Sequence, residues 1–169
     1  NAEIALGNNE WLVTCSASAG PAFEGSGTKW GMRATLGAIE KVQIVDGEVK
    51  YHTINKGKPR GICGSGLIDC IYELARNRII GRDGKFDLSR DDPRVTVAND
   101  VPEYILAFPE ETETGQAVTI TETDIANLIK SKGAIFAAVK SLVDYVGLKF
   151  DQLDTVYLAG GFGSSIDVS

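Results

Sequence analysis

An apolar segment that runs into two consecutive glycines constrains this 169-residue chain more than any other feature. Residues Asp154–Ala159 read as a strand without clean alternation, which is typical of an interior strand. Gly160-Gly161-Phe162-Gly163-Ser164 follows, and a helix is expected next. Glycines let a flat ring or a phosphate lie against bare backbone, and a helix N-terminus attracts negative charge. The pattern predicts an α/β fold with either a bound ligand at this loop or a tight strand-to-helix turn without one.

Two β-hairpins are predicted in the first third of the chain. The segments Glu3–Leu6 and Trp11–Cys15 are β-rich and flank a glycine- and asparagine-containing turn. Asp46-Gly47, a strong hairpin signal, separates Ile39–Val45 from Glu48–Ile54. We expect a mixed sheet led by the first hairpin.

Two helices and three short strands are expected in the rest of the chain. One helix covers residues Leu67–Asn77, and a longer one covers Glu122–Val146. Thr121 is the predicted N-cap of the long helix, Asp124 completes a variant capping box, and Gly147 fits its C-cap. The charged region between the helices is expected to hold strands at Val95–Val97, Tyr104–Ala107 and Ala117–Ile120, with the least certain boundaries.

The composition excludes several classes of protein. A formal net charge of -6 argues against a nucleic-acid or anionic-membrane partner. Cys15, Cys63 and Cys70 are too few and wrongly spaced for a disulfide framework, and His52 has no second histidine to share a metal site. We therefore expect a reduced, cytoplasmic chain that holds no metal ion of its own.

Two further segments could contact a ligand. Gly61-Ile62-Cys63-Gly64-Ser65-Gly66 precedes a helix, so its N–H groups could face an anion, although close helix packing is the favoured explanation on spacing alone. Cys63 is expected to be a small packing residue. Glu24 lies in a loop of small residues, where it could meet a magnesium-bound water or a phosphate edge. A solvated or helix-capping role for this carboxylate is the alternative.

Four segments occur in the order found in one known family. They are Cys15–Gly25, Gly31–Ala34, Gly61–Asp69 and Leu158–Gly163. Together they resemble the C-terminal ATPase part of the reductive activators of corrinoid proteins. These activators belong to the superfamily of acetate and sugar kinases, heat-shock chaperones and actin. The resemblance covers residues 1–167, nearly the whole chain.

The resemblance implies a nucleotide site between two α/β subdomains, each opened by a β-hairpin with an Asp-x-Gly phosphate motif. The chain is then the second subdomain, residues 1–169, truncated at both ends. Only the last residue of the family's second phosphate motif is present, and the Asp and Gly before it are absent. The residues expected at ATP or ADP are Asn1, Gly20, Glu24, Gly64, Ser65, Gly66, Gly160, Gly161, Phe162, Gly163 and Ser164, with Glu24 the only candidate for a catalytic role.

The resemblance also implies the task of the parent protein, which is ATP-dependent return of corrinoid cobalt(II) to cobalt(I). The expected partners are a corrinoid protein, the first ATPase subdomain and a second copy of the chain. An iron–sulfur cluster belongs on a separate domain, since the cluster cysteine spacings do not occur here. Magnesium would accompany ATP in the parent protein, and the fragment alone is expected to be inactive. Two alternatives are a subdomain of a small-molecule kinase and a non-catalytic docking module.

Overall fold

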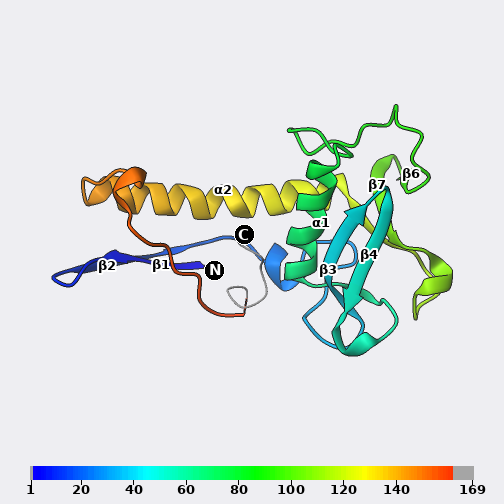
Figure 1. Ribbon diagram of the computed structural model, residues 1–169, viewed down its shortest axis with the longest axis horizontal. Coiled ribbons are helices and arrows are strands. Elements are labelled where there is room, and N and C mark those ends of the chain that lie inside the picture. Colours follow the sequence, from blue (N-terminus) through cyan, green and yellow to red (C-terminus); the bar gives the residue numbers. More distant parts are fainter. Residues whose placement is uncertain (1, 162–169) are drawn as a thin grey trace. The chain divides into compact units, whose positions relative to one another are not determined.

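The computed structural model describes residues 2–161, which form two compact units. One unit combines the described residues 2–20 and 129–161 and is called the split unit below. The other, residues 21–128, is called the inserted unit. The elements in chain order (Figure 1) are β1 (Ala2–Gly7), β2 (Leu12–Ala17), η1 (Ala22–Glu24), β3 (Ala38–Val45), β4 (Glu48–Thr53), η2 (Ile54–Lys56), β5 (Gly61–Ile62), α1 (Gly64–Arg76), β6 (Val95–Ala98), β7 (Val101–Ala107), η3 (Pro109–Glu111), β8 (Val118–Thr121), α2 (Glu122–Tyr145) and η4 (Phe150–Gln152).

The inserted unit contains a three-stranded mixed sheet in the order β4-β3-β5. Strands β3 and β4 are antiparallel, whereas β3 and β5 are parallel. Asp46 and Gly47 connect β3 to β4 with φ angles of 52° and 82°. Positive φ at both central residues is what a type I′ hairpin turn requires, so the Asp-Gly prediction is confirmed.

The second sheet of the inserted unit is an antiparallel meander in the order β6-β7-β8. Asn99 and Asp100 form its first turn, with φ angles of 50° and 61°. All three strands expected in this part of the chain are confirmed. Pro102 lies within β7, opposite Val97.

The core of the inserted unit is built from both of its sheets and from α1, which packs on β3. Burial of one large apolar side chain in such a core stabilises the fold by roughly 1.5–3 kcal/mol. Fully buried members of the core are Ile39, Ile44, Ile62, Leu67, Leu74, Tyr104, Leu106, Val118, Ile120 and Ile125.

Helix α2 begins and ends as its sequence predicts. The N–H of Asp124 donates to Thr121 Oγ1 at 3.1 Å, and the N–H of Thr121 donates to Asp124 Oδ2 at 2.9 Å. This reciprocal pair is the predicted capping box. Gly147, with φ 75°, follows the helix, and the N–H of Leu148 donates to the Val143 carbonyl at 3.0 Å. That bond is typical of a Schellman ending at glycine. Among the described residues no helix is both long and apolar enough to cross a membrane.

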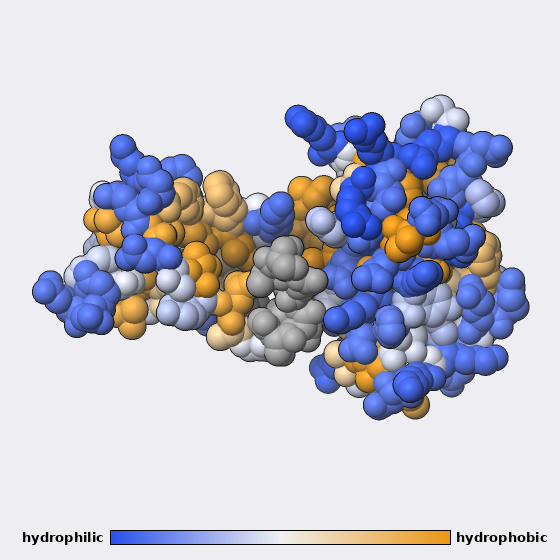
Figure 2. All heavy atoms as spheres, in the orientation of Figure 1, coloured by the Kyte–Doolittle hydropathy of each residue, from blue (hydrophilic) through white to orange (hydrophobic). Residues whose placement is uncertain are grey.

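The split unit contains the hairpin β1–β2, whose register runs from Ala2 opposite Ala17 to Gly7 opposite Leu12. The hairpin is confirmed, but it forms a two-stranded sheet of its own and does not lead the mixed sheet. Many apolar side chains of this unit are exposed, and Figure 2 shows apolar residues at its surface. The most exposed of them are Leu12, Phe136, Tyr145, Val156, Tyr157 and Leu158.

The prediction of an interior strand at Asp154–Ala159 is wrong for the described structure. The segment has no strand pairing, and Tyr157 is 87% exposed. A strand forms when a neighbour supplies backbone hydrogen bonds and covers its side chains. Within the part of the chain that the structure describes, no strand pairs with this segment.

Candidate functional site

The loop before α1 is held tightly against strand β3. The N–H of Cys63 donates to the Ile39 carbonyl at 3.1 Å, and the Ser65 hydroxyl donates to the Glu40 carbonyl at 3.0 Å. Gly66 is buried, and a Cβ at this position would overlap the carbonyl oxygen of Ile39. Gly66 is therefore required for the close approach of α1 to β3. Packing accounts for this residue, and contact of the loop with a nucleotide stays a prediction.

Glu24 lies at the end of the short helix η1, which packs against α1. Its side chain is exposed, whereas Gly64 is buried and Ser65 is half-buried at the start of α1. The structure therefore brings the segment of Glu24 beside the helix that begins with Gly64, Ser65 and Gly66. These four predicted site residues belong to the inserted unit.

The remaining described site residues belong to the split unit. Gly20 has a φ angle of 76° and Gly160 a φ angle of 89°, a conformation that favours glycine at both positions. Among the described residues, a Cβ at Gly160 or Gly161 would meet no atom within 4 Å beyond the chain neighbours. The predicted site residues Asn1, Phe162, Gly163 and Ser164 lie outside the described residues.

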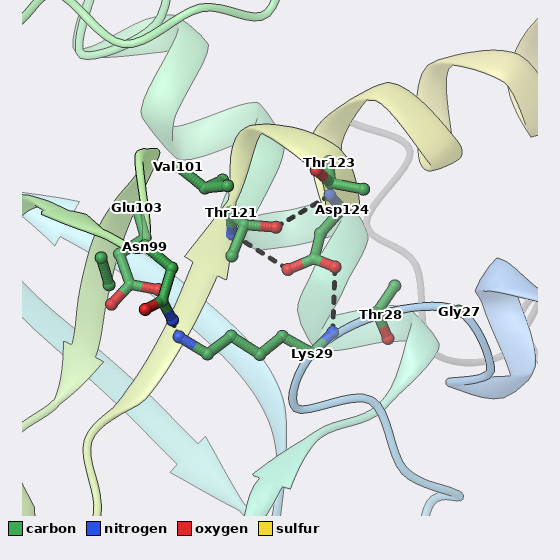
Figure 3. Close-up of a pocket in the computed structure, with 10 residues that line it drawn as sticks. Gly27, Thr28, Lys29, Asn99, Val101, Glu103, Thr121, Thr123 and Asp124 are labelled. Atoms are coloured by element: carbon green, nitrogen blue, oxygen red, sulfur yellow. Dashed lines mark hydrogen bonds and ion pairs between the residues drawn. The ribbon is translucent and has the colours of Figure 1, made fainter.

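Sequence reasoning missed a polar hollow of about 400 Å³ in the inserted unit. Figure 3 shows that its walls come from the loop before Trp30, the β6–β7 turn and the start of α2. The lining residues are Gly27, Thr28, Lys29, Ala98, Asn99, Val101, Glu103, Thr121, Thr123 and Asp124.

Lys29 connects the walls of this hollow. Its Nζ lies 2.5 Å from Oε2 of the buried Glu103, which also accepts a hydrogen bond from the Thr119 hydroxyl at 3.1 Å. Its backbone N–H donates to Asp124 Oδ1 at 2.9 Å. The Asp124 carboxylate therefore has two roles, because it caps α2 and also anchors the loop at residues 25–31.

These polar groups satisfy one another, so the network serves to position the loop at residues 25–31. A buried carboxylate would otherwise carry a large desolvation penalty. The partners are 74 and 95 residues apart in sequence, which is why local patterns gave no signal for them.

Comparison with known proteins identifies the class. All 169 residues match the family described as the C-terminal domain of RACo, the ASKHA domain. The chain belongs to this family, and both the α/β fold and the predicted resemblance are confirmed.

The relatives are proteins of corrinoid activation. The chain is 36% identical to the corrinoid activation enzyme RamQ of Eubacterium limosum, over 99% of this chain and 30% of that protein. It is 29% identical to a Methanosarcina barkeri reductase of the cobalt(II) form of a methylated-amine-specific corrinoid protein, over 99% of this chain and 31% of the reductase. A solved reductive activator for a corrinoid, iron–sulfur protein is 49% identical, with a TM-score of 0.90 over 97% of this chain and 26% of that structure. The chain thus spans less than a third of the length of these relatives.

Proposed function

We propose that this chain is the nucleotide-binding part of an ATP-dependent activator that returns corrinoid cobalt(II) to cobalt(I). The observation that carries the proposal is the match of the whole chain to one family, with close structural agreement to a reductive activator. In the proposal the domain supplies nucleotide binding and a change of conformation, while the electron arrives from elsewhere.

In the proposal two groups of residues contact the nucleotide. In the first group, an adenine or ribose would lie against the backbone of Gly160 and Gly161, where an added Cβ would meet no described atom within 4 Å beyond the chain neighbours. The proposal also assigns nucleotide contacts to Gly20, Phe162, Gly163 and Ser164.

The second group lies at the start of α1, where backbone N–H groups of Gly64, Ser65 and Gly66 are suited to phosphate oxygens. The Cβ side of Gly66 is filled by Ile39, so in the proposal a ligand contacts this residue through its N–H group alone. Asn1 would contribute as the last residue of the phosphate motif, and Glu24 would orient a water of the Mg²⁺ that accompanies ATP.

The electron source is proposed to be an iron–sulfur cluster on a separate domain. Cys63 and Cys70 are buried in the core of the inserted unit, and Cys15 lies in β2 of the other unit. Two of the three thiols therefore serve packing.

ATP can drive an unfavourable reduction only if it stabilises one conformer or complex over another. In the proposal, nucleotide bound between this domain and the first ATPase subdomain selects the conformer that holds the corrinoid protein ready for reduction.

The test uses the full-length protein with its corrinoid protein and a chemical reductant. The visible spectrum follows conversion of cobalt(II) to cobalt(I) with ATP, with ADP and without nucleotide. We expect cobalt(II) to be reduced when ATP is present, but not with ADP or without nucleotide. The rate of ATP hydrolysis should rise when the corrinoid protein is added. Equal reduction without nucleotide would refute the proposal.

A further inference from the structure

The hairpin β3–β4 presents a basic face to solvent. Lys41 lies directly opposite His52, and Lys50 lies opposite Gln43. All four side chains are exposed, whereas the alternate residues of β3 point into the core. Opposed and diagonal positions on one face of an antiparallel pair lie about 5–8 Å apart. Lys41, Lys50 and His52 are therefore gathered on one small surface, which also carries the exposed Glu48 at the turn end of β4.

Two more lysines lie on the loop that follows β4. The N–H of Gly37 donates to the Ile54 carbonyl at 3.2 Å, and the N–H of Arg60 donates to the Gly37 carbonyl at 2.9 Å. These bonds hold the loop after β4 against the start of β3. The loop carries Lys56 and Lys58, both exposed. The name basic ribbon is used below for Lys41, Lys50, His52, Lys56 and Lys58.

The lysines of the basic ribbon form no ion pairs in the part of the chain that the structure describes, while the neighbouring Arg60 pairs with Glu113 at 3.6 Å. The sequence is segregated in the same way. Residues 29–60 contain seven Lys and Arg against three Asp and Glu, although the chain as a whole carries a net charge of -6.

We propose that the basic ribbon docks an acidic surface of a protein partner, and that this partner is the corrinoid protein on which the proposed function rests. A cationic patch on an otherwise acidic protein attracts an acidic partner in one orientation and repels it elsewhere. The neighbouring aromatic Tyr51 is half-buried and donates to Glu111, so it offers no stacking platform for a nucleic acid. These features favour a protein as the occupant.

The predicted effect of the ribbon is on the rate of association. Exposed charges at the edge of an interface steer encounter and are screened by salt within about 10 Å at 0.1 M. Reversal of two of these charges should therefore slow association and leave dissociation little changed.

The test compares two double variants of the full-length protein, Lys41→Glu/Lys50→Glu and the control Arg82→Glu/Lys132→Glu. The control makes the same change in net charge at exposed basic residues outside the ribbon. Binding to the corrinoid protein is measured by biolayer interferometry at low and high salt, and basal ATP hydrolysis is measured in parallel. We expect association of the ribbon variant to fall about tenfold at low salt, with the control within twofold of wild type. Basal ATP hydrolysis should be unchanged in both.

Three results would overturn the proposal. Equal binding by wild type and the ribbon variant removes the ribbon from the interface and leaves the proposed function intact. Equally weakened binding to the corrinoid protein in both double variants would assign the effect to the net charge of the protein and not to the basic ribbon. Tighter binding of a short DNA duplex than of the corrinoid protein would make the ribbon a nucleic-acid surface. Wild-type protein that hydrolyses ATP but neither binds nor reduces the corrinoid protein would instead refute the proposed function, and with it the partner named here.

Discussion

Substitution of Gly66 by alanine tests how the loop before α1 is built. A Cβ at this position would overlap the Ile39 carbonyl oxygen and lie 2.9 Å from the Ile39 carbonyl carbon and 3.0 Å from Ile62 Cγ1. The Ile39 oxygen accepts hydrogen bonds that join β3 to the start of α1, including one from the Cys63 N–H. Relief of the overlap therefore requires the helix and the strand to separate.

The expected loss of stability follows from two opposed terms. Overpacking in a well-packed core costs about 1–3 kcal/mol. Alanine recovers at most about 1 kcal/mol of helix propensity, and less at this position because it lies in the first turn. We expect a net local loss on the order of 1–2 kcal/mol, which corresponds to roughly 5- to 30-fold more frequent opening.

Hydrogen exchange with mass spectrometry on the full-length protein measures this opening through the amides of α1 and β3. Gly133→Ala is the matched control, because Gly133 is an exposed residue within α2 whose Cβ would meet nothing within 4 Å. The control should leave exchange unchanged or slow it. Unchanged exchange in Gly66→Ala together with a large loss of ATP affinity would refute the packing argument and make Gly66 primarily a ligand contact.

Two other predictions concern buried groups of the inserted unit. Asp124→Ala should lower the free energy of unfolding by about 2–4 kcal/mol, since the N–H groups of Thr121 and Lys29 both lose their acceptor. Denaturant unfolding measures this loss, and Asp124→Asn should lose less. Wild-type stability in the alanine variant would contradict the stabilising role of this hydrogen-bond network. Burial raises the pKa of the Cys70 thiol, so Cys70 stays protonated and should resist iodoacetamide at about pH 8 while the half-buried Cys15 reacts. Peptide mass spectrometry distinguishes the two thiols, and equal alkylation would show that the core opens freely at Cys70.

Local chemistry allowed much of the fold to be predicted. Asp46-Gly47 favours one turn type, and Thr121 with Asp124 satisfies the first N–H groups of a helix, so each feature depends on residues a few positions apart. The antiparallel pairing of β6, β7 and β8 and the Lys29–Glu103 ion pair depend on residues far apart in sequence. Apolar character alone predicted a strand at Asp154–Ala159, but strand formation also needs a pairing neighbour, which hydrophobicity does not report.

The candidate site shows the same division. Glycines marked the segments at Gly61–Gly66 and Gly160–Gly161, because only glycine allows a bare or closely approached backbone. Whether that backbone meets a helix or a ligand depends on neighbours that the pattern does not name. At Gly66 the neighbour is Ile39, whereas at Gly161 no described atom beyond the chain neighbours would lie within 4 Å of an added Cβ.

The most direct test of the proposed function is the variant Gly161→Val in the full-length protein. Among the described residues a Cβ at this position meets no atom within 4 Å beyond its chain neighbours, so we expect the fold to be retained and a ligand that lies against the backbone to be displaced. Calorimetric titration with ATP, together with the ATP-dependent reduction of the corrinoid protein, measures the effect. The proposal predicts at least about tenfold weaker ATP binding, equal to 1.4 kcal/mol, and slower cobalt(I) formation at limiting ATP, with an unchanged unfolding transition. Wild-type ATP affinity and a wild-type rate of reduction in this variant would contradict it.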